Sequence, residues 1–187
     1  MVLFKRGKKK RRSIKYELLA AASSARTGSL KIENLIRRLG YRREKLFEML
    51  VEYTRKGLKE IAASYSNEIA QLDKMINELT KIQIALERVA IRAETIAMTG
   101  VAVGQVASLK GVIKELKKSL GAVIPDVSMV LSDLEGHIES AMAELEYHGG
   151  NESMITVPTS SVEVNKILRE AEEIAKIKIE ESMPKHD

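Results

Sequence analysis

The sequence has no cysteine, no tryptophan and only three prolines in 187 residues. Without cysteine, a disulfide scaffold, a thiolate zinc site and a cysteine nucleophile are all excluded. Only two phenylalanines and five tyrosines are present, so the core must be built from aliphatic side chains. The prolines, Pro125, Pro158 and Pro184, all lie in the last third, so the first 124 residues contain no obligate helix breaker.

The sequence also lacks a long hydrophobic run and a catalytic signature. No apolar stretch approaches the roughly 18 to 20 residues that a membrane-spanning helix needs. The apolar start is followed by charge, the reverse of the order in a secretory signal peptide, so we expect a soluble protein that is not secreted by that route. Neither a phosphate-binding loop nor a nucleophile motif is present, and we expect no enzyme activity, no metal and no cofactor.

The charges are divided unevenly along the chain. The net charge is +5, but residues 1–60 carry +12, residues 61–118 carry +2 and residues 119–187 carry −9. A basic front favours a polyanionic partner. An acidic end favours attraction between the two ends of the same chain or of neighbouring chains.

Apolar residues repeat every three or four positions over much of the chain, and this period indicates a coiled-coil-like helix rather than a strand. The repeat predicts one helix over residues 30–56 and a second over residues 58–99, joined near Gly57 as an antiparallel hairpin. Since these helices would be ~40 and ~60 Å long, the second is expected to overhang the first by ~20 Å. We place a polymer interface on this overhang, at Ile96 and Ala97.

Shorter helices are predicted after the hairpin. Glycines and prolines delimit helices over residues 105–120, 125–147 and 161–182, and residues 149–160 have the composition of a linker. The predicted fold is all-α, a long antiparallel helical hairpin with shorter C-terminal helices. We divide the chain into a basic N-terminal segment, a helical core, a linker and a C-terminal helix, at residues 1–29, 30–147, 148–160 and 161–187.

The N-terminal segment combines apolar residues with a dense cluster of cations. Anionic lipid surfaces attract such a cluster, and Leu3 and Phe4 can bury in the acyl boundary. A solvated tail and a nonspecific nucleic-acid arm are the alternatives. Arginines on the first predicted helix either form a solvated face or extend the basic patch. The candidate membrane-binding residues are Val2, Leu3, Phe4, Lys5, Arg6, Lys8, Lys9, Lys10, Arg11, Arg12, Arg37, Arg38, Arg42 and Arg43.

The order of these parts resembles the ESCRT-III family, and within it the archaeal cell-division branch, the CdvB-type proteins. The resemblance lies in the basic N-terminus, the hairpin sequence KLFEMLVEYTRKGLKEIAASYSNEIAQLD, the continuation ALERVAIRAETIA, the short helices between glycines, and the acidic end with its final helix. It implies a cytoplasmic protein, peripheral on the inner face of the cell membrane at the division site. There it would polymerise into filaments that remodel, constrict and cut membrane necks.

The resemblance also implies partners and roles for particular residues. A hinge between a closed and an open form falls at Gly100 and Gly104. The implied partners are anionic lipids, further copies of the chain, paralogous subunits and an AAA ATPase with an MIT domain, and no nucleic acid is expected. The final helix is the regulatory helix, and the opposite charges of the two ends favour its folding back along the basic hairpin, with a linker long enough to return along much of the first helix. Its apolar face consists of Ile167, Leu168, Ala171 and Ile174.

Two rival classes stay open at this point. One is a basic coiled-coil protein that binds nucleic acid, which the cation cluster at residues 5–12 allows. The other is a structural adaptor, which the long apolar repeat allows without any lipid contact. Binding to anionic vesicles separates the first class from the membrane-binding class, and filament formation separates the second.

Overall fold

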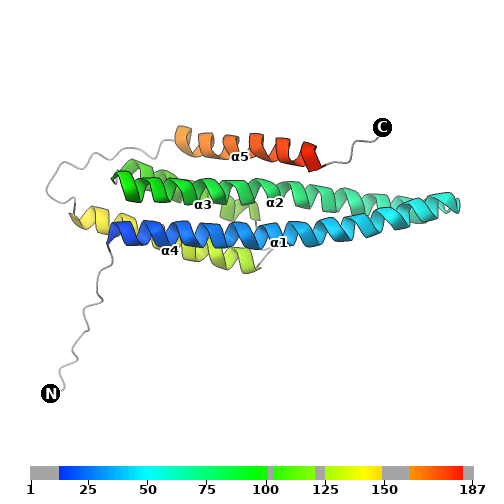
Figure 1. The fold of residues 1–187 in the computed structure, drawn as a ribbon, viewed down its shortest axis with the longest axis horizontal. Helices are drawn as coiled ribbons and strands as arrows, with labels where there is room; N and C mark the ends of the chain where they lie inside the picture. Colours follow the sequence, from blue (N-terminus) through cyan, green and yellow to red (C-terminus); the bar gives the residue numbers. More distant parts are fainter. Residues whose placement is uncertain (1–12, 101–102, 121–124, 149–160, 183–187) are drawn as a thin grey trace, which may run out of the picture.

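The structure is a computed structural model that describes residues 13–100, 103–120, 125–148 and 161–182. Five α-helices and no strand make up these ranges: α1 (Ile14–Arg55), α2 (Lys59–Thr99), α3 (Val103–Leu120), α4 (Pro125–His148) and α5 (Ser161–Ser182). α1 and α2 form a long antiparallel hairpin, and the shorter helices gather around one end of it (Figure 1). The prediction of an all-α fold built on a long hairpin is confirmed.

The first helix begins at Ile14, well before residue 30. Ser13 caps it, because the Ser13 side chain accepts a hydrogen bond from the backbone N–H of Tyr16 at 3.3 Å. Glu17 lies in the first turn, where the positive end of the helix dipole stabilises a carboxylate. α1 and α2 therefore have 42 and 41 residues, and the predicted overhang of α2 is wrong. The boundary placed between residues 29 and 30 falls inside α1.

The hairpin turns where the sequence predicted it. α1 ends at Arg55, Gly57 has a φ of +72° and α2 begins at Lys59. Glycine adopts this left-handed conformation without the steric penalty that a side chain would bring. Close to the turn, the rings of Tyr53 and Tyr65 stack with their centroids 5.4 Å apart, which joins the two helices.

The core lies at the end of the molecule opposite the hairpin turn. There α4 packs on α1 and α3, and α5 packs on α2 and α3. Small side chains let the helices approach closely: a Cβ on Gly28 would lie 2.9 Å from Val130 Cγ1 and 3.1 Å from Leu86 Cδ1. The fully buried side chains with the largest volumes are Leu18, Ile32, Leu86, Leu109, Ile113, Leu131, Leu134, Ile138 and Ile167.

Ile96 and Ala97 belong to this core, with 5% and 9% of their surface exposed. The early start of α1 gives the end of α2 a partner along its whole length, so no overhang exposes these side chains. Side chains buried inside one chain are not available to a second chain in the same state. The polymer interface predicted at Ile96 and Ala97 is therefore corrected.

Candidate membrane-binding and assembly surfaces

Arg43, one of the four arginines of α1 assigned to the membrane-binding patch, reaches across the hairpin. Its Nε donates to Asp73 Oδ1 at 2.6 Å, and its Nη2 donates to Asp73 Oδ2 at 3.3 Å. The hydrogen bond to Asp73 raises the pKa of Arg43. The charge of Arg43 is thus matched within the hairpin, and its role is to hold α1 against α2.

The other three arginines, Arg37, Arg38 and Arg42, are exposed on α1. Arg37 bonds Glu33 and Asn34 of its own helix, and Arg42 comes within 4.0 Å of a glutamate of α2. Arg38 and Arg42 are four positions apart and therefore share one face of α1. The structure thus brings two of the four arginines together on an open surface. The candidate membrane-binding residues at positions 2–6 and 8–12 lie outside the described residues.

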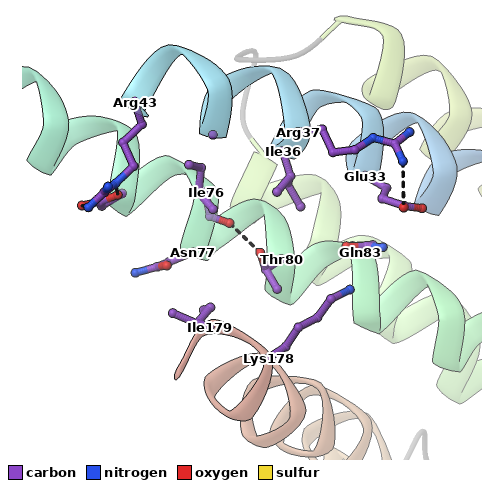
Figure 2. Close-up of a pocket in the computed structure, with 12 residues that line it drawn as sticks. Glu33, Ile36, Arg37, Arg43, Ile76, Asn77, Thr80, Gln83, Lys178 and Ile179 are labelled. Atoms are coloured by element: carbon purple, nitrogen blue, oxygen red, sulfur yellow. Dashed lines mark hydrogen bonds and ion pairs between the residues drawn. The ribbon is translucent and has the colours of Figure 1, made fainter. Parts of the chain in front are cut away.

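A cavity of about 450 Å³ opens between α1, α2 and the last described turns of α5 (Figure 2). Ile36, Ile76 and Ile179 line it, one from each helix. Lys178 of α5 and Arg37 of α1 also contribute to its lining. The last described turns of α5 therefore lie beside the basic part of the hairpin. The rest of α5 packs on other parts of α2 and on α3.

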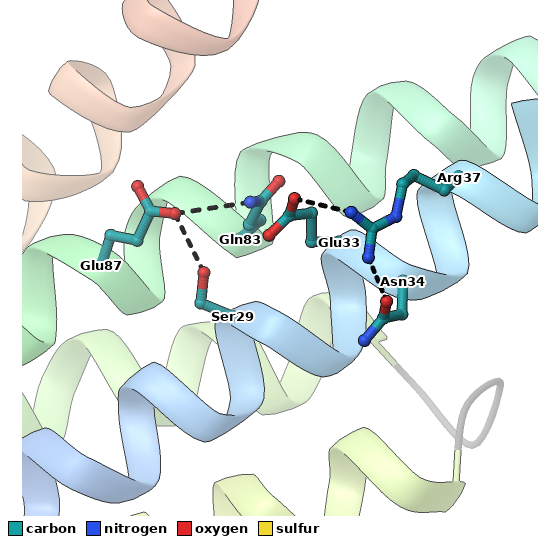
Figure 3. A network of polar contacts seen from close by, with 6 residues as sticks. All are labelled: Ser29, Glu33, Asn34, Arg37, Gln83 and Glu87. Atoms are coloured by element: carbon teal, nitrogen blue, oxygen red, sulfur yellow. Dashed lines mark hydrogen bonds and ion pairs between the residues drawn. The ribbon is translucent and has the colours of Figure 1, made fainter.

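A polar network fixes the register of the hairpin beside the core (Figure 3). Ser29 Oγ donates to Glu87 Oε1 at 3.0 Å, and Gln83 Nε2 donates to the same oxygen at 3.4 Å. Only the bond from Ser29 crosses the hairpin, and Ser29 is buried, so sliding α1 along α2 would leave its hydroxyl without this partner, at a cost of about 1–3 kcal/mol. Arg26 and Glu94 add a two-pronged ion pair at 3.1 and 2.7 Å, and the hydrogen bond to Glu94 raises the pKa of Arg26.

The C-terminal helix α5 folds back on the hairpin as the sequence predicted, but it packs on α2 and α3 and not along the first helix. Its apolar face decides the position: Ile167 and Ala171 are fully buried, and Leu168 and Ile174 pack half-buried against the core. Burying a large aliphatic side chain contributes about 1.5–3 kcal/mol, whereas an exposed ion pair contributes at most ~1 kcal/mol. The four residues assigned to the regulatory face are therefore the face that docks.

Glu163 joins α5 to both of its neighbours. One of its carboxylate oxygens pairs with Arg92 of α2. The other accepts a hydrogen bond from Ser108 Oγ of α3 at 3.1 Å. Ser108 is 2% exposed, and its hydroxyl also bonds the backbone oxygen of Gly104 at 2.9 Å. A single side chain of α5 thus bridges α2 and α3.

The two glycines assigned to a hinge flank the junction between α2 and α3. Gly100 directly follows α2 and has a φ of +115°, which residues with a Cβ rarely adopt. Gly104 lies in the first turn of α3, and residues 101–102 lie outside the described residues. The backbone therefore leaves helical geometry at Gly100, and hinge motion at this junction stays a prediction.

Three exposed apolar side chains on the hairpin were missed by the sequence analysis. Leu30, Ile91 and Met98 are 60%, 49% and 75% exposed, although buried residues surround them in the sequence. Ile91 and Met98 are seven residues apart, so they share one face of α2 outside the buried seam. That spacing was the signal in the sequence that could have identified them.

None of the described helices is long and apolar enough to span a membrane. In the same ranges, no three side chains of histidine, cysteine, aspartate or glutamate come together as a metal site would require. His137 instead bonds Glu17, with its Nδ1 at 2.8 Å from Glu17 Oε2, and so joins α4 to the first turn of α1.

Comparison with known proteins places the chain in a family. Cell division protein B1 of Sulfolobus acidocaldarius is 32% identical over 171 residues, which cover 91% of this chain and 79% of that protein. The chain belongs to the cell division protein B family. Cell division protein B of the same organism is 26% identical over 156 residues, which cover 82% of this chain and 58% of that protein. No family model and no solved structure matches the chain.

Proposed function

We propose that this member of the cell division protein B family is an ESCRT-III-like protein of archaeal cell division. It assembles into filaments on the membrane and remodels, constricts and cuts membrane necks. The observation that carries the proposal is the similarity to Cell division protein B1 over 91% of the chain. The hairpin supports it, because two helices of 42 and 41 residues make a rod about 60 Å long with sides along which copies can stack.

The proposed membrane contact is the basic front of the chain. Residues 1–60 carry +12, and each cation near an anionic surface contributes about 1 kcal/mol. Val2, Leu3 and Phe4 supply an apolar plug beside the cluster at residues 5–12. Arg38 and Arg42 extend this contact along one face of α1. The protein then lies in the cytoplasm on the inner face of the cell membrane, at the division site.

The proposed contact between copies uses the exposed apolar side chains Leu30, Ile91 and Met98 of the hairpin. Large apolar side chains on a rigid surface are what an interface between chains buries. Identical copies and paralogous ESCRT-III subunits are the proposed partners of this surface. An AAA ATPase with an MIT domain is the proposed partner of the C-terminal region.

Vesicle flotation tests the proposal against the nucleic-acid function, because cations bind both kinds of phosphate. The full chain should float with anionic vesicles and not with neutral ones. Salt should weaken this binding, since charges at the surface are screened within about 8 to 10 Å at physiological ionic strength. A chain that begins at Ser13 should lose most of the binding, and Leu3→Asp with Phe4→Asp should weaken binding to vesicles more than binding to duplex DNA. Equal flotation of the shortened chain, or equal loss of vesicle and DNA binding in this variant, would contradict the proposal.

A further inference from the structure

The outer face of α4 is open to solvent over its whole described length. α4 packs on α1 and α3 through one apolar side, where Leu131, Leu134 and Ile138 are fully buried. On the opposite side, no helix of the described ranges covers the surface. A line of mostly small side chains runs along this side, from Met129, which is 64% exposed, through Ser132, Gly136, Ser140 and Ala143.

The charge of α4 has one sign. Residues 125–148 contain six Asp and Glu residues and no Lys or Arg. Glu135 and Glu139 pair with Lys117 and Lys110 of α3 at 2.6 and 2.9 Å. Asp133 and Glu146 are exposed, and their helical positions place them on either side of the small-residue line. The open face of α4 therefore has small side chains along its middle, with Asp133 at one edge and Glu146 at the other.

The chain before Ser13 starts beside this face. α4 runs antiparallel to α1, because Glu17 bonds His137 while Gly28 approaches Val130. Ser13 lies one turn before Glu17 and so stands next to the last turns of α4. In Figure 1 the C-terminal end of α4 extends past the start of α1. The seven cations of residues 5–12 are thus attached next to α4, on which Asp133 and Glu146 are exposed.

We propose that the basic segment of residues 5–12 binds the outer face of α4 in its own chain, in competition with anionic lipid. Eight extended residues span about 26–29 Å, and Met129 to Glu146 is about 26 Å along the helix, so the segment can reach both Asp133 and Glu146. Leu3 and Phe4 then come within reach of exposed Met129. The attachment at Ser13 gives the segment an effective concentration in the millimolar range, which favours its own chain over a second copy.

The competition with lipid rests on the proposed function, whereas the docking itself does not. Docking occupies the cations that would contact phosphate groups, so an anionic membrane has to displace α4 before the segment binds. The membrane must therefore carry more than a threshold density of negative charge before the segment leaves α4. Weakening the α4 face should lower that threshold and leave the fold intact, because Asp133 and Glu146 are exposed.

Energy transfer between two dyes tests the docking in single molecules. The chain has no cysteine, so Gly7→Cys with Ser119→Cys, at the end of α3 beside the docking face and not on it, reports the distance from the segment to this end of α4 without removing a charge. Transfer should be high at low salt and should fall in 0.5 M salt, where the Debye length is about 4 Å, roughly half its value at physiological ionic strength. The variant Asp133→Lys with Glu146→Lys should lose most of the transfer. The variant Glu172→Lys with Glu173→Lys makes the same charge change on exposed residues of α5 and should keep it.

Vesicles of phosphatidylglycerol and phosphatidylcholine then separate the two claims. The α4 variant should bind these vesicles several-fold more tightly than the α5 variant, and adding vesicles to the unaltered chain should lower its transfer. Energy transfer that does not change with salt, or that falls equally in both variants, would overturn the proposal that the segment docks on α4. Transfer that appears only between two differently labelled chains would also overturn it, in favour of a contact between copies. If docking behaves as expected while no variant binds vesicles, the proposed function fails and the docking stands.

Discussion

Gly28 and Gly40 both lie inside α1, but only one of them sits at a close approach of helices. A side chain at Gly28 would meet Val130 and Leu86 at about van der Waals contact or closer, whereas a Cβ at Gly40 would meet nothing within 4 Å. Glycine lowers helix stability by roughly 0.5–1 kcal/mol relative to alanine at any interior position. The close approach of the helices explains why glycine stands at position 28, and nothing in the structure explains the glycine at position 40.

We predict opposite effects for substitutions at these two positions. Gly28→Val should destabilise the protein by about 1–3 kcal/mol, because its methyl groups force α1 and α4 apart. Gly40→Ala should stabilise it by up to ~1 kcal/mol through helix propensity alone. Gly40→Val is the control for the change of residue type. Urea unfolding followed by circular dichroism measures all three, and equal stability of Gly28→Val and Gly40→Val would contradict the close approach.

Glu163 is the polar residue that holds α5 on its two neighbours. Glu163→Ala removes the contacts with Arg92 and Ser108, and because the ion pair is one-third exposed we expect a loss of about 1 kcal/mol. The backbone amides of α5 should then exchange hydrogen about fivefold faster, while those of α1 keep their rates. Glu172→Ala, an exposed change on the same helix, should leave exchange in α5 unchanged. A uniform rise across all helices would show that Glu163 acts on global stability instead.

At the scale of the helices, the sequence predicted four of the five described helices closely and missed the start of the other one, α1. The ends of α2 to α5 lie within about two residues of the prediction, since glycines and prolines such as Gly100 and Pro125 mark them. The start of α1 was missed because its first turns bury small residues. Ala21, Ala22 and Ala25 are buried by the close approach of α4 and α2, and small residues contribute little to an apolar repeat.

The apolar face by which α5 docks was predictable from the sequence, but the place on the molecule where α5 docks was not. An amphipathic last helix must cover its apolar face, so Ile167 and Ala171 could be assigned from spacing alone. Which surface they cover depends on shape and on partners far away in the chain. Glu163 bonds Arg92, which lies 71 residues earlier, and no local pattern carries that information.

The corrected hairpin moves the expected assembly contact on α2 from Ile96 to Ile91. Ile96 is 5% exposed, so Ile96→Asp places a charge in the core and should unfold the protein, at a cost of several kcal/mol. Ile91 is 49% exposed, so Ile91→Asp should keep the helical signal and the unfolding midpoint while suppressing filaments. Circular dichroism and negative-stain microscopy measure the two effects. Normal filaments from a well-folded Ile91→Asp protein would remove this surface from the assembly contact.

At the scale of the whole molecule, α5 covers part of the hairpin that a neighbouring chain could otherwise contact. Truncation after Gly150 should lower the protein concentration at which filaments appear by several-fold, because the surface of α2 beneath Ile167 and Ala171 becomes open. Apolar burial holds α5, so added salt alone should release it only weakly. Sedimentation of assembled protein measures this change, with a chain that ends at Ser182 as the control. A truncated chain that assembles no more readily than the control would show that α5 does not restrain assembly.

The central claim is that a rigid helical hairpin with a basic front forms filaments on anionic membranes. Electron cryomicroscopy of the full chain mixed with anionic or neutral vesicles tests it most directly. We predict ordered filaments that coat the anionic vesicles and draw them into tubes or necks, and bare round vesicles in the neutral sample. Folded, dispersed protein beside undeformed anionic vesicles, at concentrations where binding by charge is expected to saturate, would contradict the account.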